Sequence, residues 1–243
     1  LQSFAHLYVQ TAKDADLLST LDLKQVTVAG DPRVDQVLSI ASADYHFPLI
    51  AQFAAQHKVF IAGSSWPPGE EILLADQQLW AGDWKLLIAP HDISAGHVQQ
   101  IIDQLELRWV RYSSAPSPED LQQARVLILD TIGMLSRVYR YGDLAYIGGG
   151  FGRSIHNTLE PAAHGLPVLF GPRHEKFSEA ITLLQRGGAF LIESTEEFQQ
   201  VFAHLSLPEN HRQAAAVIQS YLQENQGAAS LIAEELGAAL RLE

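Results

Sequence analysis

Short apolar runs alternate along the chain with amphipathic stretches of helical length. Most of the runs are continuously apolar and do not switch between apolar and polar positions. Runs of this kind are typical of strands in a parallel sheet, because helices cover both faces and bury both sides of each strand. The predicted strands are Leu7–Gln10, Val26–Ala29, Val59–Ala62, Leu86–Ala89, Arg108–Tyr112, Val126–Leu129, Leu144–Ile147, Val168–Phe170 and Ala189–Ile192.

Stretches with helical periodicity follow the later strands. Regular alternation of strand and helix predicts an α/β protein with a Rossmann-like open parallel sheet and helices on both faces. The predicted helices are Gly69–Trp80, Ser94–Leu105, Pro118–Gln123, Gly133–Arg140, Asn157–Gly165, Glu175–Arg186 and Thr195–His204.

The two ends of the chain differ from the middle. The tail from about Pro208 to Leu240 predicts two helices packed on the sheet, with breaks at Gly227 and Gly237. The first residues predict strand, helix and strand, and Asp31-Pro32 then favours an extended boundary followed by a linker to about Tyr45. We therefore expect residues 1–43 to be the remnant of a preceding domain with a linker, and residues 44–243 to be the main domain. The absence of an initial Met also suggests a piece of a longer protein.

Composition excludes several classes of function. The 243 residues are 47% hydrophobic, which is enough for a folded core, and 16 basic against 28 acidic residues give a net charge of −12. This charge disfavours binding to nucleic acid or to an anionic lipid surface. The chain has no cysteine, so it has neither disulfides nor thiolate metal sites. It also has no apolar run long enough for a membrane span and no signal peptide.

Candidate binding residues follow the predicted strands, because ligands of open α/β sheets bind at the carboxyl ends of the strands. Ser64 and Ser65 precede a helix and can present backbone N–H groups to an anion, or they simply cap that helix. His91 after Pro90 is either a ligand contact or a structural histidine. Gly133, in the segment Asp130–Met134, lets a ligand approach the backbone, or it forms a tight turn after a Thr131 cap.

The most informative loop is Gly148–Ala163. Three glycines clear space before His156, and Asn157 is a good N-cap with Glu160 placed as in a capping box. Such a helix start suits a phosphate, and the acceptor-only Glu160 carboxylate suits the hydroxyls of a ribose. The loop lies too late in the domain for a dinucleotide fingerprint, which belongs to a first strand–helix turn.

A further loop, Gly171–Phe177, carries basic residues at another strand end. Arg173, with His174 and Lys176, can supply positive charge near an acidic sugar, or the loop is simply solvated.

These motifs together resemble the donor-binding half of the 3-deoxy-D-manno-octulosonic acid (Kdo) transferases that build lipid A. The block around His156 is specific, and Gly63-Ser64-Ser65 with Glu70-Glu71 and Ala89-Pro90 falls in the family's order. The matching segments are Asp130-Thr131-x-Gly133, Gly148-Gly149, His156-Asn157-x-Leu159-Glu160-Pro161-Ala162-Ala163-x-Gly165-x-Pro167-Val168 and Gly171-Pro172.

The resemblance implies the C-terminal half of a GT-B glycosyltransferase, a fold of two Rossmann-like domains. This half would bind the donor CMP-Kdo, with no metal or other cofactor. The missing N-terminal domain, of which residues 1–43 would be a remnant, would hold the lipid A precursor, the membrane contact and the catalytic base. The parent would invert the anomeric carbon at the cytoplasmic face of the inner membrane of a bacterium. The fragment itself is expected to be soluble, to bind CMP weakly and to transfer nothing.

The resemblance also assigns site residues. Those expected by position to contact CMP are Pro90, His91, Ile132, Gly133, Met134, Asn157, Thr158, Leu159 and Glu160, and Ser64 and Ser65 are candidates for the phosphate or Kdo. The loops themselves add Gly150, His156 and Arg173 to the expected donor contacts.

Two departures from the family pattern matter. Many members have Pro-Arg-His where this chain has Pro90-His91-Asp92, so Arg153 or Arg173 would have to supply the missing charge. Ser154-Ile155 stands where the family usually has glycines. The alternatives are a GT-B enzyme that uses a UDP-sugar, either a transferase or a 2-epimerase, and a non-catalytic nucleotide-binding domain.

Overall fold

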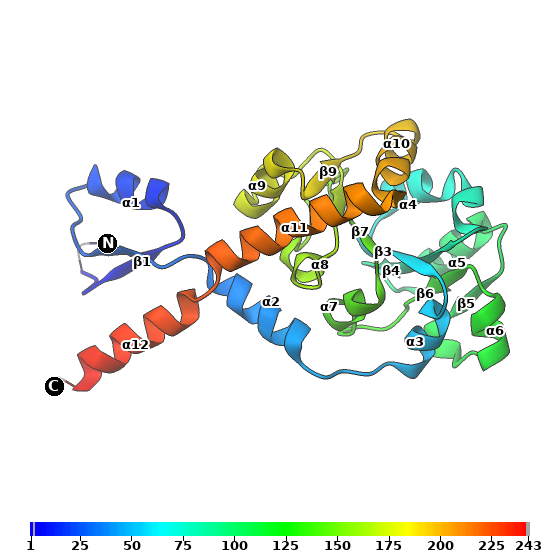
Figure 1. Ribbon diagram of the computed structural model, residues 1–243, viewed down its shortest axis with the longest axis horizontal. Coiled ribbons are helices and arrows are strands. Elements are labelled where there is room, and N and C mark those ends of the chain that lie inside the picture. The colour runs from blue at the N-terminus through cyan, green and yellow to red at the C-terminus, as the bar shows by residue number, and fades with distance from the viewer. Residues whose placement is uncertain (2, 242–243) are drawn as a thin grey trace.

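The fold is organised around a sheet of seven parallel strands in the order β5-β6-β4-β3-β7-β8-β9 (Figure 1). The computed structural model describes residue 1, residues 3–237 and the backbone of residues 238–241. All predicted strands are confirmed, within a residue or a few at their ends. In the sheet they are β3 (Lys58–Ser65), β4 (Trp84–Pro90), β5 (Trp109–Arg111), β6 (Val126–Ile128), β7 (Leu144–Ile147), β8 (Val168–Phe170) and β9 (Ala189–Leu191).

Helices cover both faces of the sheet, as the alternation predicts. Along β3, Val59 and Ile61 point into one apolar layer, and Phe60 and Ala62 point into the other. The first layer is covered by α2 (Pro32–Ser42), α3 (Pro48–Ala54), α6 (Pro118–Gln123), α7 (Leu135–Val138), α8 (Leu159–Ala163), α9 (Ser178–Arg186) and much of α11 (Pro208–Asn225). The second is covered by α4 (Pro67–Leu74), α5 (Ala95–Gln104) and α10 (Thr195–Ser206) (Figure 1).

The chain reverses its direction across the sheet between β3 and β7. From β3 it proceeds to β4 and then to the edge strand β5, inserts β6 between them, and returns to pair β7 with the other side of β3. The neighbouring strand ends then diverge into different connections, and the crevice outside them is the usual ligand site of this architecture.

The segment predicted to be a linker is the helix α2, which corrects the reading of residues 31–45. The Asp31 side chain accepts a hydrogen bond from Arg33 N at 2.9 Å and so caps the helix. Pro32 stands at the first helical position, where its missing N–H costs nothing. Val34 and Val37 are buried in the core. Residues 32–42 therefore pack onto the sheet domain, and the origin of residues 1–43 in another domain stays a prediction.

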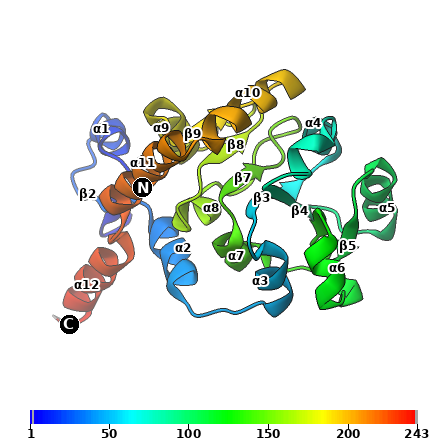
Figure 2. The same ribbon diagram turned by 45° about the vertical axis from the view of Figure 1, so that its right-hand side comes forward.

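The two ends of the chain lie together, away from the sheet (Figures 1 and 2). β1 (Leu7–Val9), α1 (Ala12–Ser19) and β2 (Val26–Val28) form a small unit with a two-stranded parallel sheet. Tyr8 Oη donates to Glu235 of α12 (Ala228–Arg241) at 2.8 Å.

The predicted tail is partly confirmed. Gly227, with φ of 100°, breaks the helix as expected, whereas Gly237 lies inside α12 and breaks nothing. α11 packs on α8, α9 and α10, but α12 contacts α2 and extends away from the sheet. Among the residues described, no helix combines the length and the hydropathy that a bilayer crossing needs.

Candidate functional site

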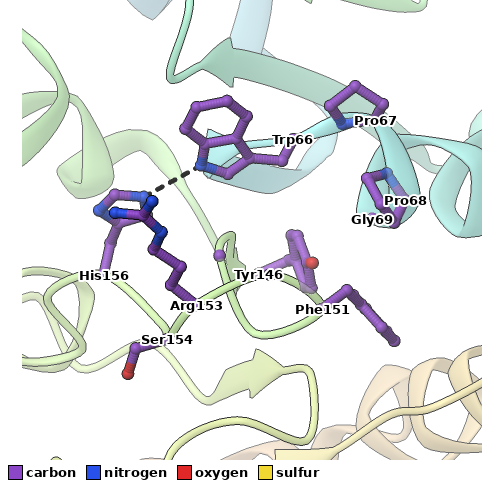
Figure 3. A pocket seen from close by; sticks show the side chains of 11 residues that line it. Trp66, Pro67, Pro68, Gly69, Tyr146, Phe151, Arg153, Ser154 and His156 are labelled. Carbon is purple, nitrogen blue, oxygen red and sulfur yellow. Dashed lines mark hydrogen bonds between the residues drawn. The ribbon is translucent and has the colours of Figure 1, made fainter.

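Three aromatic rings meet at the crevice between β3 and β7. Trp66 follows β3, His91 follows β4, and His156 lies in the loop after β7. The Trp66 and His91 rings stack with centroids 4.7 Å apart, and His91 stacks on His156 at 4.5 Å. Trp66 Nε1 donates to His156 Nε2 at 3.1 Å, the dashed line in Figure 3. Loops from three strands are thus joined at the topological switch point.

The Trp66 contact determines the protonation of His156. An indole N–H can only donate, so His156 Nε2 must be the acceptor, and the neutral ring carries its proton on Nδ1. Burial lowers the pKa of His156, and the charge of neighbouring His91 lowers it further. His156 is therefore a neutral donor through Nδ1 at neutral pH.

The β3 loop is supported from beneath by a buried polar network. Ser65 Oγ donates to Glu70 Oε1 at 2.6 Å, and His97 Nε2 lies 3.0 Å from Glu70 Oε2. Ser65 is fully buried, so its side chain supports the loop and does not face a ligand, which corrects its predicted role. Ser64 is the irregular residue of the β3–β4 pairing, with φ of 50°, and it is partly exposed at the crevice.

The loop after β6 presents an open surface. Ile132 is 86% exposed, and Gly133 has φ of 83° with open space where a Cβ would stand, so both are accessible as predicted. Thr131 Oγ1 contacts Met134 Sδ at 3.0 Å, and α7 begins only at Leu135 without a side-chain cap. The predicted Thr131 cap is therefore wrong, because the loop runs on by one more turn.

Asp130, at the end of β6, anchors this loop. Its carboxylate accepts hydrogen bonds from Ser113 Oγ at 2.6 Å and from Arg111 Nε at 2.8 Å. Burial acts against the charged form, but these hydrogen bonds outweigh it and hold the pKa of Asp130 below its usual value. Asp130 thus stays ionised and keeps the loop in place.

The predicted capping box at α8 is not formed. α8 begins at Leu159; Asn157 Oδ1 accepts from Leu159 N at 3.0 Å, and Asn157 Nδ2 donates to Glu160 Oε1 at 3.2 Å. The Glu160 carboxylate is thus held by the side chain of Asn157 and not by the backbone of Asn157. Glu160 can still accept further hydrogen bonds from a ligand. Burial raises the pKa of Glu160, although the Asn157 hydrogen bond opposes the rise.

Two neighbours of Glu160 are not side-chain ligands. Thr158 and Leu159 are fully buried, so only their backbone groups can reach a donor. The pattern did not reveal this, because α8 turns these positions toward the core.

A cavity of about 460 Å³ opens beside the ring cluster, between the start of α4 and the glycine loop (Figure 3). Its walls are mostly apolar, with Arg153 and His156 at one side. Its lining residues are Trp66, Pro67, Pro68, Gly69, Tyr146, Gly149, Phe151, Gly152, Arg153, Ser154 and His156. The predicted contacts Ile132–Met134 and Asn157–Glu160 lie outside this cavity, and His156, next to Asn157, joins the two regions.

Two other predicted contacts have structural roles. A Cβ on Gly150 would lie 2.7 Å from Gly171 N, so this glycine allows two loops to pack and does not clear space for a ligand. Arg173 Nη1 donates to Gly152 O at 2.6 Å and does not line the cavity.

Trp66, Tyr146 and Phe151 were absent from the predicted site. The available signal was the position of Trp66 and Phe151 in loops that directly follow strands.

Comparison with known proteins finds sequence relatives among bacterial glycosyltransferases. No family model matches the chain. It is 25% identical over 231 residues to a bifunctional glycosyltransferase/methyltransferase of Fusobacterium nucleatum, covering 93% of this chain and 36% of that protein. It is 29% identical over 171 residues to the 3-deoxy-D-manno-octulosonic acid transferase of Chlamydophila psittaci, covering 69% of this chain and 38% of that enzyme. The chain thus spans well under half of these relatives.

Solved structures show the same fold. The C-terminal CMP-Kdo binding domain of WaaA from Acinetobacter baumannii superimposes with a TM-score of 0.63 at 20% identity, covering 78% of this chain and 97% of that domain. A UDP-N-acetylglucosamine 2-epimerase gives 0.61 at 15% identity, covering 86% of this chain and 51% of that enzyme. The chain is therefore similar in sequence to 3-deoxy-D-manno-octulosonic acid transferases and shares its fold with the C-terminal CMP-Kdo binding domain of WaaA.

Proposed function

We propose that the chain is the donor-binding part of a Kdo transferase and holds CMP-Kdo at the crevice between β3 and β7. The family's characteristic segment, His156 to Glu160, lies at this topological switch point. Both the sequence relatives and the similar CMP-Kdo binding domain favour this nucleotide sugar over a UDP-sugar.

The observation that carries the proposal is the state of Glu160. Its carboxylate is partly buried at the edge of the crevice, and Asn157 is the one side-chain hydrogen-bond partner found for it in the described part of the chain. A carboxylate with unused acceptor positions suits the two hydroxyls of a ribose, which donate to it. The exposed Ile132–Met134 loop lies at the end of β6, where it can contact the base.

The reaction belongs to the whole enzyme and not to this chain. We propose that the parent inverts the anomeric carbon of Kdo, with CMP leaving and a lipid A precursor attacking. The carboxylate base, the acceptor site and the membrane contact at the cytoplasmic face of the inner membrane belong to the N-terminal domain. The chain itself would bind the nucleotide without turnover.

Titration calorimetry with CMP and UDP tests the proposal. We expect CMP to bind more tightly than UDP, and Glu160→Ala to weaken CMP binding about tenfold or more, because a hydrogen bond to a charged group is worth roughly 1.5–3 kcal/mol. Glu71→Gln, at an exposed position of α4, is the matched control and should bind as the wild type does. Tighter binding of UDP would instead select a UDP-sugar enzyme, and no response to either nucleotide would refute the donor site.

A further inference from the structure

The cavity beside the ring cluster combines apolar walls with one kind of charge. Pro67, Pro68, Tyr146 and Phe151 are apolar or aromatic, and Arg153 is the ionised side chain in the lining, since His156 is neutral. Its volume of about 460 Å³ falls in the range of about 300–1,000 Å³ that is usual for small-molecule sites. A cationic cavity in a chain of net charge −12 is unusual and points to an anionic ligand.

Arg153 is not committed to the fold. Across the described residues its side chain has neither an ion pair nor a hydrogen bond, whereas Arg173 is tied to Gly152 O. Figure 3 shows Arg153 reaching toward Trp66 and His156. An unpaired guanidinium at a cavity wall is placed to donate two parallel N–H hydrogen bonds to a carboxylate.

The aromatic walls of the cavity indicate that its ligand also has an apolar surface. Trp66 is 38% exposed and Phe151 is partly exposed, so each offers apolar surface to a bound molecule. The carbon skeleton of a sugar packs on such surfaces through its C–H groups, because aromatic faces carry negative charge density. Neighbouring Ser154 and the Nδ1–H of His156 can serve its hydroxyls.

We propose that this cavity binds the sugar-acid moiety of the donor, with its carboxylate on Arg153 and its carbon skeleton against Trp66 and Phe151. The inference rests on the proposed function and deepens it. Arg153, and not Arg173, then supplies the charge that is missing after Pro90. A neutral N-acetylhexosamine has no negative charge to pair with this guanidinium, so we expect the cavity to favour the acid.

The test follows the indole N–H signal of Trp66 in ¹H–¹⁵N spectra of the chain, assigned with Trp66→Phe. The probes are free 3-deoxy-D-manno-octulosonic acid, neutral N-acetylglucosamine and CMP, each titrated alone. We expect the sugar acid to shift this signal and to bind about tenfold more weakly to Arg153→Gln, with partial recovery in Arg153→Lys. Arg212→Gln, an exposed arginine on α11, is the matched control and should bind the acid as the wild type does.

Each outcome bears on a separate claim. The inference is overturned if the acid leaves the Trp66 signal unchanged, if it binds Arg153→Gln as tightly as the wild type, or if Arg173→Gln abolishes binding in place of Arg153→Gln. Equal binding of N-acetylglucosamine also overturns it. The CMP titration tests the nucleotide site independently, because free CMP carries no sugar carboxylate for Arg153. Failure of CMP alone would therefore refute the proposed function and not the sugar-acid cavity.

Discussion

Gly148 holds the two strand ends of the site at their close approach, which makes Gly148→Ala a stringent test of the geometry. Gly148 N donates to Gly63 O at 2.9 Å, where β7 leaves the sheet beside β3. A Cβ at this position would lie 1.9 Å from Ser64 O and 2.8 Å from Ser65 Cα. Both neighbours are backbone atoms, so no side-chain rotation can relieve the overlap.

The displacement can be worked out from these distances. Ordinary van der Waals contact begins at 3.4 Å, and 3.4 − 1.9 = 1.5 Å of separation must be gained at Ser64 O. Extra atoms forced into a packed region typically cost about 1–3 kcal/mol. At roughly 2–4 °C per kcal/mol for a domain of this size, the melting temperature should fall by about 2–12 °C. The same shift separates Ser64 from the glycine loop and should weaken CMP binding severalfold.

Thermal unfolding and CMP calorimetry measure both effects. Gly96→Ala is the control, because a Cβ there meets nothing within 4 Å and alanine is the better helix former in α5. It should keep CMP binding and melt no lower than the wild type. If Gly148→Ala matched the control in both assays, the close approach of β3 and β7 would be refuted, and with it the crevice as the binding site.

The remaining predictions concern titrating groups. Glu160→Gln should raise the melting temperature of the ligand-free chain, because burial raises the pKa of this carboxyl and so disfavours its charged form in the fold at neutral pH; a lower melting temperature would contradict this. Burial lowers the pKa of Lys85 to about 8 from 10.5, and Arg125 adds to the shift. The unfolded chain therefore binds more protons between these two values, and the unfolding free energy of the wild type should rise with pH across that window. Lys85→Met should lack this rise in unfolding free energy, which urea unfolding at the two ends of the pH window measures. An equal pH dependence in the two proteins would show that Lys85 is not its source. Trp66→Phe should raise the pKa of His156 toward its usual value, because the neutral ring loses its hydrogen-bond donor. Titration of the His156 ring protons by NMR checks this, and an unchanged or lower pKa would argue against the contact.

Much of the sheet can be read from the sequence. β7 and β8 begin and end at the predicted residues, and their side chains are buried on both faces. A continuously apolar strand must be shielded from water on both faces, and a parallel sheet with helices on both sides provides this. The carboxyl-end loops follow from the same reading, which is why His91, Gly133, His156 and Glu160 were identified as candidates.

Local patterns misled where a residue had two possible roles. Asp31-Pro32 suits both a linker and a helix start, and the burial of Val34 and Val37 in the sheet's core decides for α2. Gly237 weakens a helix without ending it, whereas Gly227 ends one because its φ is positive. Ser65 and Thr158 are polar residues of the segments that were predicted to bind a ligand, yet both are buried.

Periodicity alone therefore predicts a parallel sheet with helices on both faces, and the loops at its strand ends. It does so because the apolar pattern within each strand or helix shows which of its faces are buried. The tertiary structure decides which of those loops touch. Trp66 reaches His156 across 90 positions of sequence only because β3 pairs with β7. Arg173 reaches the carbonyl of Gly152 because the loops after β7 and β8 approach closely at Gly150 and Gly171. Contacts of this kind depend on strand order and register, which no local pattern specifies.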